Sequence, residues 1–560
     1  MKQLILKYAL QNAVKFNGKA NPGAIIGKVL SENPDLKSKA KEVNKDIMQI
    51  VKEVNSLPLD KQKEKLKDLA PDLLKKQKKV EKKKELPTFK EKKVVMRFEP
   101  SPSGPLHIGH AFTLSLNSEL ARKHKGKLII RIADTNPENI YEKAYKLIPI
   151  DAEWITKNNV NDIIIQSDRL KLYYKYAEEL IKKEHAYVCT CKAEDFRESM
   201  LKSIPCPCRH IRKQANVERW EKMLTTFKEG DAVVRIKTDI THKNPAMRDW
   251  PALRINLNSH PKQKTKYRVW PLMNFAVTID DHELGITHAI RAKEHMDNEK
   301  RQKYLYDYLG WKMPEHLYIG RINFKDLRVS CSKTRPLIED GTYTGWDDIR
   351  LPFLEALKRR GYHPDAFIKY ALDVGISQTD KTTTGEEFFK AINAFNKDAI
   401  DSKSHRYFFI ESPVEIKVSN APMQNVELDL HPNNRKKGRK FSTTDKFYLT
   451  KEDHKNIKDN KLIRLMDCLN FKKEGKEFTF DSLDYNKFKE QGNLIIHWLP
   501  KEKDLVNVEV IMPDNKIKKG LGERGLKDLS EGQVIQFERF GFVRLDQKLG
   551  NKLVFWFAHK

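Results

Sequence analysis

The sequence predicts a multidomain protein, in which a helical N-terminal region precedes a central α/β domain, a helical connector and an all-β C-terminal region. The chain has 560 residues, enough for about three to five domains of ordinary size. Apolar strand-like runs alternate with helical segments between residues 94 and 290, which is typical of a parallel sheet. After residue 407 the chain breaks into short β-type runs separated by turns, as in β-barrels.

The charge balance favours a polyanionic partner. The chain carries 106 Lys and Arg against 77 Asp and Glu, a formal net charge of +29. Counterion release then drives binding to nucleic acid, although a high charge also serves solubility. No run reaches the ~18 apolar residues of a membrane helix, and the amphipathic N-terminus lacks a signal-type cleavage site. We therefore expect a soluble, cytoplasmic protein with no membrane partner.

Residues 1–90 are predicted to form a helical extension that ends in a linker. Apolar residues recur at helical spacing as far as Val54. The stretch 75–93 holds ten Lys and three Glu and is broken at Pro87. This composition is typical of a solvated helix or linker, and contact with nucleic-acid phosphates is the alternative.

The central domain is predicted over residues 91–335. It begins with a buried strand at 94–98, which is followed by a helix from about Gly109. Further strands are predicted at 128–132, 163–165 and 286–290. Residues 336–405 have the pattern of a helical connector, and residues 406–560 that of the β-barrel region.

Four of the six cysteines lie close together, as Cys189, Cys191, Cys206 and Cys208. Two C-x-C pairs on a short stretch offer the four thiolates that a tetrahedral zinc site needs. His210 could replace one ligand, and four reduced cysteines without metal are the alternative. A disulfide framework is not expected in a Lys-rich chain of this size without a signal peptide.

Two histidines flank the expected start of the first helix of the central domain. His107 and His110 lie three residues apart, with Gly109 between them allowing a ligand to approach the backbone. Helix N-termini favour phosphate, and imidazoles can hydrogen-bond its oxygens. The pair alone is weak evidence for nucleotide binding, because two such histidines could also be helix caps or half of a metal site.

The surrounding motifs resemble the class I aminoacyl-tRNA synthetases, and within them the glutamyl/glutaminyl subgroup. The first motif is RFEPSPSGPLHIGH at 97–110. In order there follow DTNPE at 134–138, QSDR at 166–169, DDHELGITHAIR at 280–291, GWDDIRLP at 345–352 and FERFGFVR at 537–544. The resemblance covers essentially the whole chain and is greatest to archaeal-type glutamyl-tRNA synthetases.

The resemblance implies a Rossmann-like catalytic domain, with an insertion at about 187–260 that binds the tRNA acceptor end, and C-terminal barrels that bind the anticodon. It further implies that ATP with Mg²⁺ activates L-glutamate to glutamyl adenylate. The glutamyl group then passes to the 3′ end of tRNA(Glu), and whether tRNA(Gln) is also charged stays open. The chain is expected to act as a monomer, with zinc in a structural role.

The ATP-binding residues implied by the resemblance come from two signatures. His107, Gly109 and His110 match the first, and Glu294 matches a position that lines the nucleotide site. The second signature, a mobile lysine-bearing loop, falls at 329–334, VSCSKT, in a degraded form. Ser332 and Lys333 are the expected ATP contacts there. The alignment of this signature with the sequence is fixed to within about two residues. His107, His110 and Lys333 are the expected catalytic residues.

The glutamate-binding residues implied by the resemblance are Arg97, Glu99, Ser101 and Arg291. Arginine suits bidentate recognition of a carboxylate, although Arg97 could instead form a structural ion pair. Relatives often carry an acid where this chain has Ala133, so Glu99 is the hypothesis for binding the substrate ammonium group. Met273 stands where many relatives carry Tyr.

Basic residues outside the catalytic centre are candidates for tRNA contacts. Arg209, Arg212 and Lys213 follow the cysteines, and a basic run, NNRKKGRK, lies at 433–440. A solvated loop is the alternative for that run.

Three other functions remain open at this stage. Glutaminyl-tRNA synthetases share the fold and many site residues. A small-substrate nucleotidylyltransferase could also carry the histidine turn, and a non-catalytic tRNA-binding protein could keep the same architecture.

Overall fold

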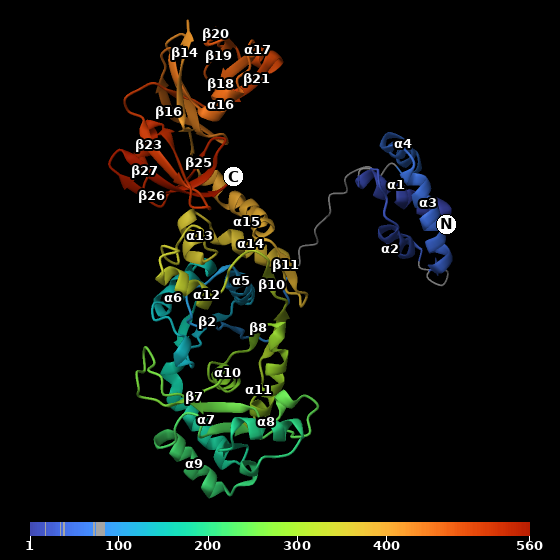
Figure 1. The fold of residues 1–560 in the computed structure, drawn as a ribbon, viewed down its shortest axis with the longest axis vertical. Helices are drawn as coiled ribbons and strands as arrows, with labels where there is room; N and C mark the ends of the chain where they lie inside the picture. The colour runs from blue at the N-terminus through green and yellow to red at the C-terminus, as the bar shows by residue number, and fades with distance from the viewer. Residues whose placement is uncertain (17, 34, 37–39, 71–72, 74–84) are drawn as a thin grey trace. The chain divides into compact units, whose positions relative to one another are not determined.

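The computed structural model describes the chain except for residues 17, 34, 37–39, 71–72 and 74–84 (Figure 1). It divides into two compact units, Met1–Lys83 and Lys84–Lys560. Across the described ranges, no helix has both the length and the apolar character needed to cross a membrane.

The N-terminal unit is helical, as predicted. Its described elements are α1 (Lys2–Lys15), α2 (Pro22–Glu32), α3 (Ala40–Asn55) and α4 (Leu59–Leu69). Apolar side chains at helical spacing form its core, including Ile5, Leu10, Ile25, Val29, Val43, Ile47 and Val51. The buried Gln62 amide donates to the carbonyl oxygens of Gly18 and Val54 and so fixes α4 against the other helices. Residues 74–84 of the Lys-rich stretch lie outside the described residues.

The central sheet is parallel and has the order β3-β2-β1-β8-β9. Its strands are β1 (Val95–Phe98), β2 (Lys127–Ile132), β3 (Asp162–Ile165), β8 (His288–Ala292) and β9 (Glu315–Ile319). The predicted strands are thus confirmed. The chain leaves β1 to form β2 on one side, and β8 lies on the other side of β1. The carboxyl end of β1 is therefore the point at which an open parallel sheet places its ligand crevice.

Helices cover this sheet on both sides. They are α5 (Ile108–Lys123), α6 (Ala144–Thr156), α10 (Met273–Glu283) and α11 (Met296–Leu309). Buried side chains from β1, β2 and α5 join those of α14 (Pro364–Val374) in one core, among them Met96, Leu116, Ile130 and Phe367. The first turn of α5 is thereby held directly after β1, which positions the histidine pair.

The insertion between β3 and β8 forms its own antiparallel sheet, β4-β5-β6-β7. Its elements are α7 (Leu170–Lys182), β4 (Ala186–Cys189), α8 (Ala193–Leu201), α9 (Lys213–Thr225), β5 (Val233–Ile236), β6 (Pro251–Ile255) and β7 (Val269–Pro271). The sheet continues past the expected end at residue 260, because β7 supplies the fourth strand.

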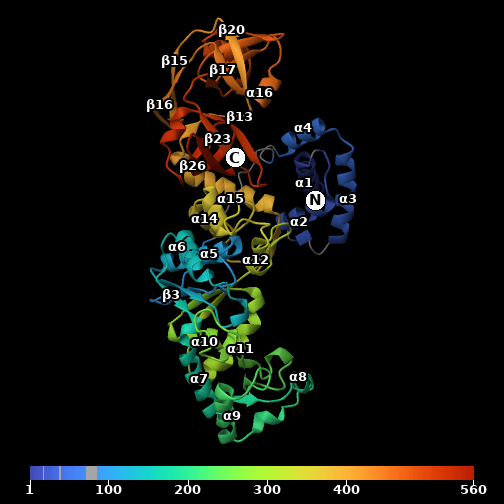
Figure 2. The ribbon, with the colours of Figure 1, turned by 60° about the vertical axis from the view of Figure 1, so that its left-hand side comes forward.

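The connector is mainly helical, with α12 (Cys331–Glu339), α13 (Leu354–Arg360), α14 (Pro364–Val374) and α15 (Gly385–Ile400). Short strands β10 (Ile322–Phe324) and β11 (Lys381–Thr383) pair in parallel beside it. Figures 1 and 2 both show α14 next to α5.

The C-terminal region is built of two seven-stranded barrel-like sheets, as the β-type runs predicted. One has the order β12-β25-β26-β27-β23-β24-β13 and the other β21-β18-β19-β20-β14-β17-β22. Their strands are β12 (Arg406–Tyr407), β13 (Phe409–Glu411), β14 (Pro413–Ser419), β17 (Lys446–Thr450), β18 (Leu462–Leu465), β19 (Asn470–Glu474), β20 (Glu477–Ser482), β21 (Gly492–Ile496), β22 (Leu499–Pro500), β23 (Val506–Ile511), β24 (Ile517–Gly522), β25 (Val534–Phe537), β26 (Gly541–Leu549) and β27 (Lys552–His559).

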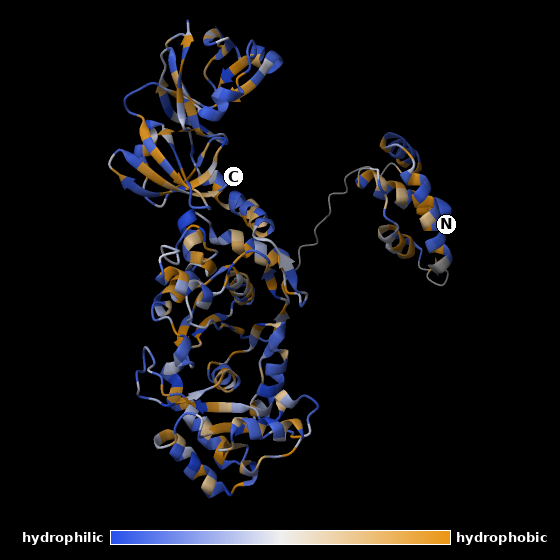
Figure 3. Ribbon diagram, in the orientation of Figure 1, coloured by the Kyte–Doolittle hydropathy of each residue, from blue (hydrophilic) through white to orange (hydrophobic). Residues whose placement is uncertain are grey.

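The remaining elements of this region lie between these strands. They are the hairpin β15 (Asn425–His431) and β16 (Asn434–Ser442), and the helices α16 (Lys451–Asn456) and α17 (Tyr485–Gln491). Aromatic and branched side chains form the cores enclosed by the sheets. Figure 3 shows the hydrophobic residues of β23 and β27 in orange.

Two arginines at the end of α13 join the connector to the C-terminal sheet. Arg359 donates to both carboxylate oxygens of Asp546, at 2.9 and 2.7 Å. Arg360 is buried and donates to the carbonyl oxygens of Phe557 (3.1 Å) and Ala558 (2.8 Å). Buried hydrogen bonds of this kind fix the position of the barrels on the connector.

We expect Arg360→Ala to destabilise this junction by about 2–4 kcal/mol, because two buried carbonyl oxygens lose their donor. Calorimetric unfolding should show a lower midpoint for the variant, by several degrees. Lys358→Ala, at an exposed position on the same helix, is the control. Equal midpoints for the two variants would contradict the structural role of Arg360.

Candidate active site

The histidine pair forms a compact cap on α5. The Nδ1 atom of His107 accepts the backbone N–H of Gly109 at 3.1 Å, and Nδ1 of His110 accepts that of His107 at 3.4 Å. The two rings stack, with centroids 3.7 Å apart. Burial lowers the pKa of His110 to about 4. Burial and then the neighbouring His110 lower the pKa of His107 well below its usual range. Both rings are therefore neutral near pH 7, and each presents Nε2–H as a donor.

The turn that carries these histidines is fixed by the GWDDIRLP segment. The backbone N–H of Ile108 donates to Pro352, and that of Leu354 donates to Leu106. On its other side, the Leu106 N–H donates to the buried carboxylate of Asp151 at 2.9 Å. These three bonds hold the backbone of the turn on both sides.

The second signature packs directly against the first. A Cβ atom at Gly104 would lie 2.9 Å from Cβ and Sγ of Cys331, so only glycine allows this approach. The Cys331 thiol is buried, which raises its pKa to about 11 and leaves it unreactive. Ser332 and Lys333 are exposed. Within the described residues, Lys333 makes no ion pair.

The predicted loop 329–334 differs from the structure in one respect. From Cys331 onward its residues form the first turn of α12 rather than a loop. Lys333 therefore lies at a helix N-terminus, where the backbone also favours an anion.

A cluster of buried ion pairs lies beneath the crevice (cluster A). Arg97 donates to both carboxylate oxygens of Asp281, at 2.8 and 3.1 Å. Arg131 donates to Asp281 at 2.7 Å and to Glu99 at 2.8 Å. Burial alone would raise the pKa of Asp281, but Arg97 and Arg131 hold it below its ordinary range. Asp280 extends the cluster by accepting Arg169 at 2.7 Å.

Arg291, near the end of β8, is a cation of this region with an unsatisfied donor. Its side chain is buried, at 8% exposure, and its Nη1 atom has no hydrogen-bond partner among the residues that the structure describes. Burial and then the like charge of Arg97 lower the pKa of Arg291. A buried guanidinium with a free donor is costly unless an anion completes it.

The charges of cluster A, Arg291 and Glu299 balance. Four guanidinium groups face four carboxylates; the members are Arg97, Arg131, Arg169, Arg291, Glu99, Asp280, Asp281 and Glu299. Glu299 on α11 accepts a hydrogen bond from the neutral hydroxyl of Tyr318, which leaves its negative charge in place. The unsatisfied donor of Arg291, rather than an excess of positive charge, is therefore the feature that suits a further anion.

The remaining predicted substrate residues are more scattered. Ser101 is exposed. Glu99 is already shared by two guanidinium groups through Oε2. Its Oε1 atom has only a 3.4 Å contact from the Gln166 amide. Glu294 is half exposed and pairs with Arg321 at 3.5 Å. Met273 is also exposed, at the start of α10.

Sequence reasoning missed Arg131, Asp281 and Asp151. For Arg131 and Asp151, the one available signal was a charged residue among apolar neighbours, whereas Asp281 lies in a polar run at the end of α10 and gave no such signal. It also missed His260, which joins the insertion to the catalytic domain by an Nε2 contact to the carbonyl oxygen of Asp134 at 3.0 Å. The carboxylate of Asp134 in turn accepts Ser167 and Tyr145 at 2.7 Å each.

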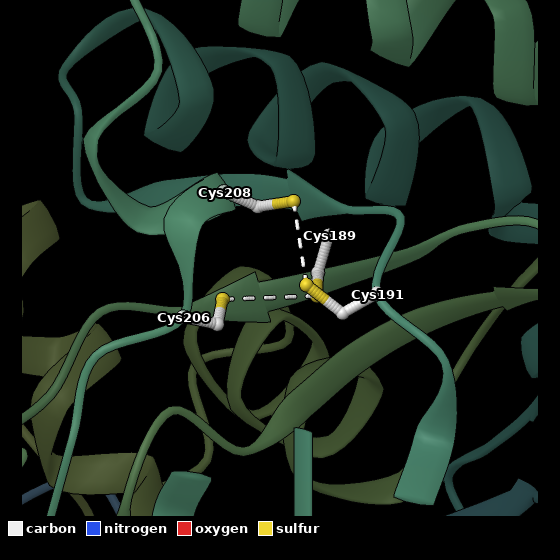
Figure 4. A group of neighbouring side chains, drawn as sticks. All are labelled: Cys189, Cys191, Cys206 and Cys208. Carbon is white, nitrogen blue, oxygen red and sulfur yellow. Dashed lines mark hydrogen bonds between the residues drawn. The ribbon is translucent and has the colours of Figure 1, made fainter. Parts of the chain in front are cut away.

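The four cysteines converge in the insertion (Figure 4). Their Sγ atoms all lie within 4.8 Å of one another. Cys189 and Cys206 are 3.9 Å apart, and Cys191 and Cys208 are 3.7 Å apart. Four sulfurs around zinc, with Zn–S bonds of about 2.3 Å, are separated by about 3.8 Å. The donor set therefore fits zinc.

The surroundings favour the thiolate at Cys206 and Cys208, whereas they raise the pKa of Cys189 and Cys191. Burial raises the pKa of Cys208, but the backbone N–H and the hydroxyl of Thr190 and the guanidinium of Arg219 bring it below its usual value. None of the six cysteines, all of which are described, forms a disulfide. His210 is exposed and lies outside this group of ligand atoms.

Comparisons with known proteins agree along the whole chain. A family described as "tRNA synthetases class I (E and Q), catalytic domain" matches residues 93–402. Two anticodon-binding domain families of the same group match residues 404–486 and 495–546. Curated relatives called glutamate–tRNA ligase occur in Methanocaldococcus jannaschii (44% identical), Methanobrevibacter smithii (43%) and Pyrococcus abyssi (45%). Each match covers 100% of both chains.

Asp151 should make the stability of this region depend on pH. Burial raises its pKa to about 8 from an ordinary value of 3.8. The folded state therefore holds the proton of Asp151 more tightly than the unfolded state does. The resulting contribution to the free energy of unfolding is fully present below about pH 4 and is lost as the pH rises to about 8. Relative to Asp151→Asn, wild-type protein should lose thermal stability over this interval.

The measurement is the unfolding midpoint of both proteins from pH 5 to pH 9. Asp162→Asn, on the exposed start of β3, controls for a general effect of removing a carboxylate. A difference between wild type and Asp151→Asn that does not change with pH would show that the carboxylate is not protonated in the folded protein.

Proposed function

The chain belongs to the class I tRNA synthetases for glutamate and glutamine, and we propose that it is a glutamate–tRNA ligase that works in the cytoplasm. A glutamate carboxylate oxygen attacks the α-phosphorus of ATP, and pyrophosphate leaves with the electrons of the broken P–O bond. A hydroxyl of the 3′-terminal ribose of tRNA then attacks the glutamyl carbonyl, and AMP leaves. Such reactions depend mainly on positioning and charge stabilisation.

The observation that carries this proposal is the free donor of Arg291. The side-chain carboxylate of L-glutamate can accept a charge-assisted hydrogen bond from Nη1 of Arg291. The side-chain amide of glutamine is neutral and offers this donor only an uncharged oxygen. A carboxylate at Nη1 of Arg291 supplies the missing acceptor. Glutamate is therefore favoured over glutamine as the amino-acid substrate.

The other amino-acid contacts follow from cluster A. Arg97 is held rigidly by Asp281 and by Glu99 (3.3 Å), so its positive charge is fixed beside the substrate without reorganisation. The substrate ammonium group binds Oε1 of Glu99, the oxygen left free by the two arginines. Ser101 is a further contact from the turn.

ATP lies across the two signatures. The Nε2–H groups of His107 and His110 donate to phosphate oxygens at the N-terminus of α5. Gly109 keeps the space beside the His107 ring clear, since a Cβ atom there would lie 3.0 Å from it. Ser332 and Lys333 reach the phosphates from α12, and Glu294 borders the nucleotide. Mg²⁺, bound with ATP, offsets the phosphate charge.

Zinc bound by Cys189, Cys191, Cys206 and Cys208 stiffens the insertion that receives the tRNA acceptor end. The exposed Arg212 and Lys213 follow the last cysteine and contact acceptor phosphates. Arg209 has a structural role instead, because it donates to the buried Asp249 at 2.9 Å.

The anticodon lies on the C-terminal sheets. A cleft of about 740 Å³ there is lined by the cations Lys440, Arg524 and Lys527 and also by acids, among them Asp504 and Asp528. The cations bind the nucleic-acid backbone. Arg439 of the basic run is engaged by Glu523 at 2.8 Å.

The direct test is aminoacylation by the full chain, which we expect to act as a monomer. Radiolabelled glutamate or glutamine is supplied with ATP and Mg²⁺, and with separate transcripts of tRNA(Glu) and tRNA(Gln). We expect glutamate on tRNA(Glu). Glutamate on tRNA(Gln) as well would identify a relaxed tRNA choice. Glutamine on tRNA(Gln) alone would overturn the substrate, and tRNA binding without charging would identify a binding protein.

Arg291→Gln should raise the KM for glutamate about 100-fold, because a charge-assisted hydrogen bond is lost in a buried site. The KM for ATP should change much less. Arg291→Lys keeps the charge but loses the planar guanidinium group. Its KM for glutamate should therefore lie between those of wild type and Arg291→Gln. Lys300→Gln, on the exposed face of α11, removes a charge without this contact. An unchanged glutamate KM in Arg291→Gln would be incompatible with the assignment.

The double variant Cys206→Ser and Cys208→Ser should lose one zinc ion per chain, measured by atomic absorption after dialysis. Its affinity for tRNA should also fall, because the insertion loses its cross-link. Cys468→Ser, a buried cysteine of the C-terminal region, should keep the wild-type metal content. If wild type and the double variant held equal zinc, the four cysteines would be reduced and without metal.

A further inference from the structure

A second group of possible metal ligands lies at the amino ends of the central strands, opposite the end that carries the active site (site B). It consists of Glu91, His288 and Glu315. His288 and Glu315 are the first residues of β8 and β9 and are direct partners in the register. Glu91 lies in the segment that leads into β1. Since β1, β8 and β9 are parallel, site B is at their amino ends, whereas the substrate crevice is at their carboxyl ends.

His288 has a buried nitrogen without a partner. The side chain is fully buried, and Nε2 makes no hydrogen bond within the described part of the chain. Nδ1 lies 2.8 Å from Oγ1 of Thr287. That hydroxyl also accepts the N–H of Val95 and donates to its carbonyl oxygen. When Nδ1 carries the ring proton and donates it to Thr287, the lone pair of Nε2 points into site B.

The ring of His288 is held in this orientation by stacking. Phe89 lies between two imidazoles, with its centroid 3.7 Å from that of His288 and 4.6 Å from that of His124. The interplanar angles are 17° and 16°. The ring cannot easily turn away from the two carboxylates, so Nε2 is preorganised as a ligand.

The distances in site B are those of ligands around one ion. Nε2 of His288 lies 3.4 Å from Oε2 of Glu91 and 3.6 Å from Oε2 of Glu315. In a tetrahedral zinc site, bonds of about 2.0–2.2 Å separate neighbouring N and O ligands by about 3.4 Å. The three ligand atoms all lie within 4.8 Å of one another.

We propose that Glu91, His288 and Glu315 form a binding site for a divalent metal ion, with Zn²⁺ as the ion that suits one imidazole and two carboxylates. The ion would join the segment before β1 to the starts of β8 and β9, and its fourth position would be open to water beside the exposed Glu315. Its role is structural, because the site lies away from the substrate crevice.

A simple ion pair is the competing explanation, but the surroundings do not favour it. The side chain of His288 is fully buried, and among the described residues its Nε2 atom makes no hydrogen bond although it lies 3.4 and 3.6 Å from the two carboxylates. An ion pair with good hydrogen-bond geometry is therefore not formed at this nitrogen. Lys312 approaches the other oxygen of Glu91, at 3.5 Å, and its side chain is 85% exposed. A metal ion supplies a positive charge where Nε2 points.

The test counts zinc on the full-length protein. Chelator-treated wild type and the double variant Glu91→Gln and Glu315→Gln are dialysed against Zn²⁺, and bound metal is measured by atomic absorption. We expect the double variant to bind one zinc fewer per chain than wild type, whatever the cysteines bind. The control removes two partly exposed carboxylates of α7, Glu178→Gln and Glu179→Gln, and should bind as much zinc as wild type.

Thermal unfolding provides an independent measurement. Zinc added to protein already saturated at the cysteines should raise the midpoint of wild type and of the control, but not that of the double variant. Equal midpoints of all three proteins in chelator would show that the double variant folds. Equal zinc content and equal zinc-dependent shifts in wild type and the double variant would overturn the proposal.

Discussion

The buried carboxylate of Asp281 is the constraint on which the catalytic centre depends. It accepts two guanidinium groups, Arg97 from β1 and Arg131 from β2, and it reaches them from α10. Buried charges are tolerated only when they are paired with good geometry, and removing one partner is strongly destabilising. The pairing therefore requires β1, β2 and α10 to be in place together. It also explains how Arg291 can remain buried with a free donor, because the charge around it is fixed rather than mobile.

The second constraint is the close contact between the two signatures. Gly104 lets Cys331 approach the turn before α5, and Asp151 holds the same turn from α6. The two histidines proposed to bind phosphate and Lys333 thus come from helices whose starts are joined by the contact of Cys331 with Gly104 and Pro105, rather than from independent loops. A small displacement of α12 would move the side chains of both signatures. The position of the connector can therefore affect the reaction at the carboxyl ends of the central strands.

Much of this architecture could be predicted from sequence, because strands 94–98 and 128–132 and the helix after His107 are specified by local pattern. The charge pairing could not. Arg97 and Asp281 are 184 residues apart, and no local periodicity indicates that they meet. The same limit applies to Glu99, whose charge is largely used by the arginines. The helical start of α12 was missed because the expected loop came from a resemblance, whereas the packing of Cys331 on Gly104 decided the local structure.

The central claim is that a fixed, incompletely paired arginine selects an acidic amino acid. A crystal structure of the protein with glutamate bound tests it most directly. The account predicts a glutamate carboxylate oxygen within hydrogen-bond distance of Nη1 of Arg291, with Arg97 still paired to Asp281. Glutamate bound elsewhere in the crevice, with Nη1 of Arg291 still unpartnered, would contradict it.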